Sequence, residues 1–142
     1  MINLLGISTA LIFLSIALLH IKWAFGSRLD SNTVIPTRDG RPLFQPSTGM
    51  TLLVALALLI SAFLVLGTLG FGRLGLPLWL FKVGSWGVAT ILFVRAIGDF
   101  RLVGFFKRVR NTPFARNDTL YYSPLCLYLA LSCAAVGLWT VT

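Results

Sequence analysis

Residues 49–71 form an apolar run without a single charged side chain. An α-helix rises about 1.5 Å per residue, so about 20 such residues cross the hydrocarbon core of a bilayer. A soluble domain of this size could not bury a helix that is apolar on every side. The run therefore predicts a transmembrane helix.

Three further apolar blocks lie at about residues 4–26, 77–99 and 123–141. Lys82 interrupts the block at 77–99, but a lysine near a helix end can extend its ammonium group to the lipid headgroups. Pro77 and Pro124 stand where a helix would take its first turn, a position that favours proline. We predict an all-α fold, a polytopic membrane protein whose single domain, residues 1–142, is a bundle of four transmembrane helices.

Small residues recur at helical spacing in the last two blocks. Such residues let helix backbones approach closely, which drives helix packing in lipid. Both cysteines belong to this pattern, and their spacing is not that of a CxxC redox pair. We expect helix contacts at Gly84, Ser85, Gly87, Ala89, Cys126, Ala130, Cys133, Ala134 and Gly137.

Basic residues are unevenly distributed among the connections. Three lie in loop 27–48, five in loop 100–122 and only Arg73 between the second and third spans, whereas the termini have none. Because basic loops stay in the cytoplasm, we predict a multi-pass protein of the cell membrane with both long loops cytoplasmic and both termini non-cytoplasmic. The first of these loops also contains Asp39-Gly40, which predicts a tight turn or stub hairpin.

The overall charge points to lipid rather than to nucleic acid. The chain has 12 Lys and Arg, 4 acidic residues and a formal charge of +8, a balance also found in nucleic-acid-binding proteins. The charges lie in loops and at helix ends. The preference of basic loops for the cytoplasm and the attraction to anionic lipids therefore account for them. We therefore expect membrane lipids, especially anionic ones, as partners, and no nucleic acid.

The richest run of polar and aromatic side chains is RAIGDFRLVGFFKRVR, residues 95–110. Arg95 and Asp99 are one helical turn apart and can pair on one helix face. The third helix could continue to Arg110, where Asn111-Thr112-Pro113 would stop it. Its basic face would then reach lipid phosphates. The candidate headgroup-binding residues are Arg95, Arg101, Lys107, Arg108 and Arg110.

His20, the only histidine, lies near the cytoplasmic end of the first span, at the same membrane level as Arg95 and Asp99. We therefore predict a polar cluster of His20, Arg95 and Asp99. Arg95 and Asp99 could be a structural ion pair or could hold an anion, and His20 could be an interfacial hydrogen-bonding residue or a proton carrier. A lone histidine cannot build a histidine-rich metal site, so we expect no metal. No residue pattern indicates a cofactor.

The chain resembles a known family in several segments. These are the histidine and tryptophan that end the first span, the DGRPLF loop at 39–44, the RAIGDFR segment at 95–101 with its VGFFKRVR continuation, and YYSPLC at 121–126. They resemble a bacterial family of small four-helix membrane proteins classed as a domain of unknown function. The resemblance covers nearly the whole chain and implies a bacterial membrane location and four helices, but no activity.

Three functions remain open. The first is binding of, or an enzymatic reaction on, an anionic lipid or amphiphile at the cytoplasmic polar cluster. The second is an accessory subunit of a membrane complex or a homo-oligomer whose small residues serve helix contacts. A small transporter is the third, with less support because no acidic residue lies at mid-membrane. Common hydrolase, kinase and metalloenzyme motifs are absent from the sequence.

Overall fold

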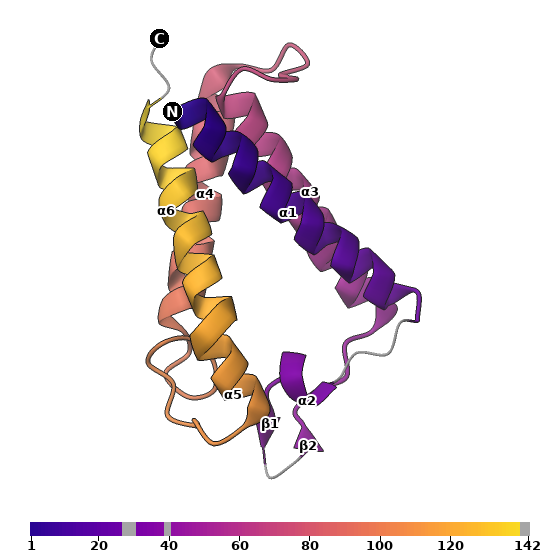
Figure 1. Cartoon of the computed structure of the whole chain (residues 1–142). Helices are drawn as coiled ribbons and strands as arrows, with labels where there is room; N and C mark the ends of the chain where they lie inside the picture. The colour runs from indigo at the N-terminus through magenta and orange to yellow at the C-terminus, as the bar shows by residue number, and fades with distance from the viewer. Residues whose placement is uncertain (27–30, 39–40, 140–142) are drawn as a thin grey trace.

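Four long helices dominate the computed structural model, which describes residues 1–26, 31–38 and 41–139 (Figure 1). They are α1 (Ile2–Ala24), α3 (Thr48–Thr68), α4 (Leu78–Ile97) and α6 (Ser123–Trp139). By length and composition, the four helical segments that contain them can each cross a membrane. The prediction of an all-α, four-helix membrane bundle is confirmed.

The helices form two pairs, α1 with α3 and α4 with α6. The pairs lie together near the N-terminus and diverge toward the opposite end (Figure 1). We call the first end, which includes the α3–α4 connection, the terminal end. The second, with residues 25–26, 31–38, 41–47 and 98–117, is the loop end. The core joins both pairs and contains Ala10, Phe13, Ala62, Val65, Ala89, Leu129, Cys133 and Val136.

Small residues make close contacts possible between the helices. A Cβ at Gly67 would overlap the ring of Phe81, and Thr68 Oγ1 and Ser85 Oγ share a hydrogen bond of 2.9 Å inside the bundle. On α6 the expected packing residues Ala130, Cys133 and Gly137 are buried. The expectation for Gly87 is wrong, since a Cβ there would meet open space.

The α3–α4 connection begins with a glycine turn. Gly70 has a φ of +101°, which favours glycine. The N–H of Phe71 donates to Leu66 O at 2.9 Å and the N–H of Gly70 donates to Gly67 O at 3.1 Å. These bonds satisfy carbonyls that the helix end would otherwise leave free, so α3 ends at Thr68 rather than at Phe71.

The first connection at the loop end contains short elements. Helix α2 (Ser31–Val34) is followed by strands β1 (Thr37–Arg38) and β2 (Arg41–Pro42). The strands are antiparallel, with Thr37 opposite Pro42 and Arg38 opposite Arg41. This pairing agrees with the expected stub hairpin, while its Asp39-Gly40 turn lies outside the described residues.

The fourth span begins earlier than expected. Helix α5 (Pro113–Asn117) continues through a π-helical turn, η1 (Asp118–Tyr122), into α6. Thr112 caps α5 by accepting a hydrogen bond from the N–H of Ala115 at 3.0 Å, so Pro113 starts a helix instead of stopping one. Ser123-Pro124 lies inside the continuous helical segment Pro113–Trp139, so it does not start the span although α6 is counted from Ser123. Because Pro124 has no N–H, the wide turn directly before it relieves the mismatch.

Candidate functional site

Helix α4 ends at Ile97, so the expected extension to Arg110 is wrong. Gly98 has a φ of +95°, which directs the chain out of the helix. Residues 98–112 instead fold back as a loop, which we call the basic loop. The N–H groups of Phe105 and Phe106 donate to Ala96 O at 2.9 Å and Ile97 O at 3.4 Å. The loop thus satisfies the last carbonyls of α4.

Two glycines allow this fold-back. A Cβ at Gly98 would overlap the backbone of Val103 and Gly104, and a Cβ at Gly104 would overlap the backbone of Ile97 and Gly98. Both glycines have positive φ. The two chain segments therefore cross at a distance that leaves no room for side chains.

Asp99 holds the start of the basic loop. Its Oδ1 accepts hydrogen bonds from the backbone N–H groups of Arg101 (2.9 Å), Leu102 (2.7 Å) and Val103 (2.9 Å). Burial tends to raise the pKa of the Asp99 carboxyl, but the N–H groups of Leu102, Arg101 and Val103 together hold that pKa below its ordinary value. The predicted Arg95–Asp99 pair is wrong, because Gly98 takes Asp99 off the helix face that carries Arg95.

The carboxylate partner of Arg95 is Asp118. Arg95 Nη2 donates to Asp118 Oδ1 at 2.8 Å, and Lys107 Nζ and the N–H of Gly104 donate to Asp118 Oδ2 at 2.9 and 2.8 Å. Asp118 is 0% exposed and Lys107 is 2% exposed. We call Arg95, whose side chain is 32% exposed, Lys107 and Asp118 the charged triad. It joins the end of α4, the basic loop and η1.

Lys107 uses all of its hydrogen-bonding capacity within the protein. Besides Asp118 it donates to Gly104 O at 2.8 Å and to Thr119 Oγ1 at 2.7 Å. An ammonium group has three protons, so none remains for a ligand. Of the buried side-chain polar atoms described, Arg95 Nη1 and Ser123 Oγ lack a protein partner. The charged triad is thus a structural clamp whose members largely satisfy one another's hydrogen bonds.

The other arginines of this region are exposed. Arg101, Arg108, Arg110 and Arg116 all lie on the surface of the basic loop and α5. Within the described residues, no salt bridge involves any of them. The candidate headgroup residues therefore divide into two classes: Arg95 and Lys107 bind Asp118, while Arg101, Arg108 and Arg110 face outward.

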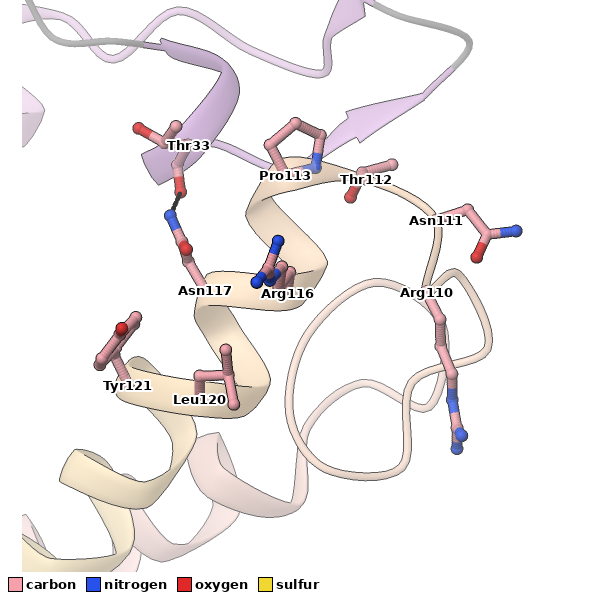
Figure 2. Close-up of a pocket in the computed structure, with 9 residues that line it drawn as sticks. All are labelled: Thr33, Arg110, Asn111, Thr112, Pro113, Arg116, Asn117, Leu120 and Tyr121. Carbon is pink, nitrogen blue, oxygen red and sulfur yellow. Dashed lines mark hydrogen bonds between the residues drawn. The ribbon is translucent and has the colours of Figure 1, made fainter.

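An open hollow of about 600 Å³ lies beside two of the exposed arginines. Figure 2 shows Arg110 on the basic loop, Arg116 on α5, and Leu120 and Tyr121 on η1 among its lining residues. Across it, Asn117 Nδ2 donates to Thr33 O of α2 at 3.5 Å (Figure 2). Among the residues that the structure describes, no acidic side chain lines the hollow. The arrangement can hold an anion next to an apolar edge.

His20 lies in a different place. Its Nδ1 hydrogen-bonds Ile16 O at 2.8 Å, and its ring packs on Trp23 with 5.0 Å between ring centroids. It lines a second cavity, of about 360 Å³, between α1, α2 and α3. In the described structure His20 makes no hydrogen bond with Arg95 or Asp99, so the predicted three-residue cluster does not form.

Asp118 and Thr119 were missed from the sequence. The sequence feature that could have identified Asp118 is the small number of acidic residues, 4 against 12 Lys and Arg. Asp118 is the acidic residue in the segment that follows the basic run, so it was an obvious partner for a buried cation. A spacing rule for helices favoured the nearer Asp99 instead.

Among the residues that the structure describes, no group of three or more His, Cys, Asp or Glu side chains could hold a metal ion.

Comparison with known proteins identifies a family. Residues 13–133 match the family model described as "Protein of unknown function (DUF3995)". No curated protein and no solved structure matches the chain.

Proposed function

Because the chain belongs to the DUF3995 family of proteins of unknown function, its activity has to be inferred from its own geometry, and we propose that it binds the headgroup of an anionic phospholipid. The binding site is the hollow beside Arg110 and Arg116. The loop end then lies at the cytoplasmic membrane interface, where anionic lipids attract basic segments.

The observation that carries the proposal is the division of the basic residues into two classes. Asp118 engages Arg95 and Lys107, which leaves the charges of Arg110 and Arg116 without a carboxylate partner among the described residues. An arginine can bind phosphate oxygens through two parallel N–H groups, which suits it to a lipid phosphate.

The apolar border of the hollow favours a lipid over a free anion. Leu120 and Tyr121 line it and are 54% and 65% exposed. On the same end of the molecule Phe100 and Phe106 are exposed and contact each other, with 6.3 Å between ring centroids. Aromatic side chains of this kind are common at the level of lipid headgroups. A headgroup in the hollow would thus have its acyl chains next to apolar side chains.

The small-residue faces give less support to the alternative of an interaction subunit. Ala130, Cys133 and Gly137 pack within the chain, and Gly137 would have the Trp86 ring 3.1 Å from an added Cβ. These residues are therefore buried within the chain and are not available to a partner helix.

The test measures lipid binding of the purified protein by native mass spectrometry, with phosphatidylglycerol and phosphatidylcholine as probes. A hydrogen bond to a charged group contributes about 1.5–3 kcal/mol, so Arg110→Gln/Arg116→Gln should weaken phosphatidylglycerol binding by on the order of 100-fold or more. Arg101→Gln/Arg108→Gln is the matched control, because it removes the same charge from the same end without touching the hollow.

A second pair of variants tests the geometry. Arg110→Lys/Arg116→Lys keeps the charge but loses the planar fork, so binding should fall to an intermediate level. Equal losses in the two Gln variants would mean that the surface attracts anionic lipid without a defined site. Unchanged phosphatidylglycerol binding in Arg110→Gln/Arg116→Gln would overturn the proposal.

A further inference from the structure

The second cavity, which we call the His20 cavity, is separate from the arginine hollow. His20 and Trp23 of α1 form one side, Val34 and Ile35 lie toward the loop, and Leu53 and Val54 of α3 form the other side. Its volume of about 360 Å³ is within the range of roughly 300–1,000 Å³ that small-molecule sites occupy. Apart from His20, Thr51 and the indole N–H of Trp23, the described residues that line it are apolar.

The cavity is continuous with the membrane-facing side of α3. Met50, Leu53 and Val54 line it and are 58%, 67% and 45% exposed, and α3 is one of the four helices that can span the membrane. An apolar cavity that opens along such a face is accessible to hydrocarbon chains from the bilayer. Such a cavity suits an amphiphile whose chain enters from the lipid.

The polar groups in the cavity narrow the chemistry of the occupant's head. The Thr51 hydroxyl donates its proton to Ser47 O at 3.0 Å, so toward an occupant it can only accept. Ile16 O can only accept, so His20 Nδ1 is the donor in their 2.8 Å hydrogen bond. The neutral ring then carries its proton on Nδ1, which makes Nε2 an acceptor. Nε2 has no hydrogen-bond partner in the described part of the chain.

From this geometry we infer that the His20 cavity binds a hydroxyl-bearing amphiphile, with the apolar chain against Ile35 and Val54 and the hydroxyl donating to His20 Nε2. A long-chain alcohol has this chemistry. The site is independent of the arginine hollow, because it takes a neutral donor head and is built from α1, α2 and α3 rather than from the basic loop and α5.

The experiment uses two photoreactive probes, a diazirine-bearing hexadecanol and its methyl ether, with the purified full chain in lipid nanodiscs. The probes have the same chain, but only the alcohol can donate a hydrogen bond. One hydrogen bond contributes enough to favour the alcohol by about fivefold. Labelled peptides identified by mass spectrometry should come from α1 and α3 residues at the cavity.

Three variants separate chain binding from head binding. Val54→Trp fills the cavity and should abolish labelling by both probes, whereas Leu56→Trp, on an exposed part of α3 outside the cavity, should not. His20→Phe keeps an aromatic ring against Trp23 but has no acceptor, so both probes should label equally. Equal labelling of the wild type by alcohol and ether overturns the inference without any variant, as does equal labelling of Val54→Trp and Leu56→Trp.

Discussion

At the scale of single residues, the Asp118 side chain links α4, the basic loop and η1. Both of its carboxylate oxygens accept hydrogen bonds, from Arg95 on one side and from Lys107 and the Gly104 N–H on the other. Removing one member of a buried charge network leaves the others unpaired in a medium that solvates them poorly. Stability should therefore depend on Asp118 much more than on the exposed Asp99.

Asp118→Asn should lower the free energy of unfolding by about 3–5 kcal/mol, because the Lys107 ammonium would remain buried without a counter-charge. Denaturant unfolding in detergent micelles measures the change. The double variant Asp118→Asn/Lys107→Met should recover part of the loss, since replacing a buried pair together is often nearly neutral. Asp99→Asn is the control. A loss from Asp118→Asn no larger than the control's loss would contradict the clamp role.

At the scale of elements, the basic loop is held by backbone geometry more than by apolar packing. Its first turn depends on Asp99, whose carboxylate accepts three backbone N–H groups. Its crossing depends on Gly98 and Gly104, and its return to the helix depends on hydrogen bonds to Ala96 O and Ile97 O. The contribution of the Asp99 carboxylate changes with pH.

The pKa of Asp99 is lowered below its ordinary value of 3.8. A carboxyl of this kind stabilises the folded loop at pH above 3.8, and the stabilisation is lost as the pH falls through the lowered pKa. Amide hydrogen-exchange protection at Arg101, Leu102 and Val103 should thus be constant from pH 7 to about 5 and fall below 3.8. In Asp99→Ala these amides should be weakly protected throughout. A wild-type protection that does not change down to pH 2 would contradict this role.

At the scale of the whole molecule, the two helix pairs meet through the core and again at the loop end. There Tyr122 Oη donates to Thr33 O at 3.3 Å and Asn117 Nδ2 donates to the same carbonyl at 3.5 Å. Both long connections lie at this end, opposite the N-terminus and the α3–α4 connection (Figure 1). Membrane orientation therefore follows from a single choice of which end faces the cytoplasm.

Cysteine labelling measures that orientation. In a Cys126→Ala/Cys133→Ala background, a membrane-impermeant maleimide applied to intact cells should label Phe71→Cys but not Gln45→Cys or Asn111→Cys. The reason is the concentration of basic residues in the two long connections. All three positions should react after the cells are opened, which controls for buried sites. Labelling of Gln45→Cys or Asn111→Cys in intact cells would reverse the assignment.

The sequence by itself determined the four helices, because the hydrocarbon of the bilayer imposes helical structure on long apolar segments. In hydrocarbon every backbone N–H and C=O needs an internal partner, so a long apolar run without charges has to be a helix. The small residues of α6 were readable for a similar reason, since lipid gives helices no hydrophobic drive to associate and close backbone approach has to replace it. The resemblance of the motifs to a family also followed from the residues alone.

Only the tertiary structure decided which charges meet. Arg95 could be placed against Asp99 by helical spacing, but spacing rules apply only while the helix continues, and Gly98 ends it. The partner, Asp118, is distant in sequence and reaches Arg95 because the basic loop folds back and the π-helical turn η1 directs the carboxylate inward. His20 likewise faces a cavity lined by α1, α2 and α3, segments that no local sequence pattern places together. Long-range contacts of this kind arise from the path of the loops, which depends on the summed packing of all elements rather than on any local pattern.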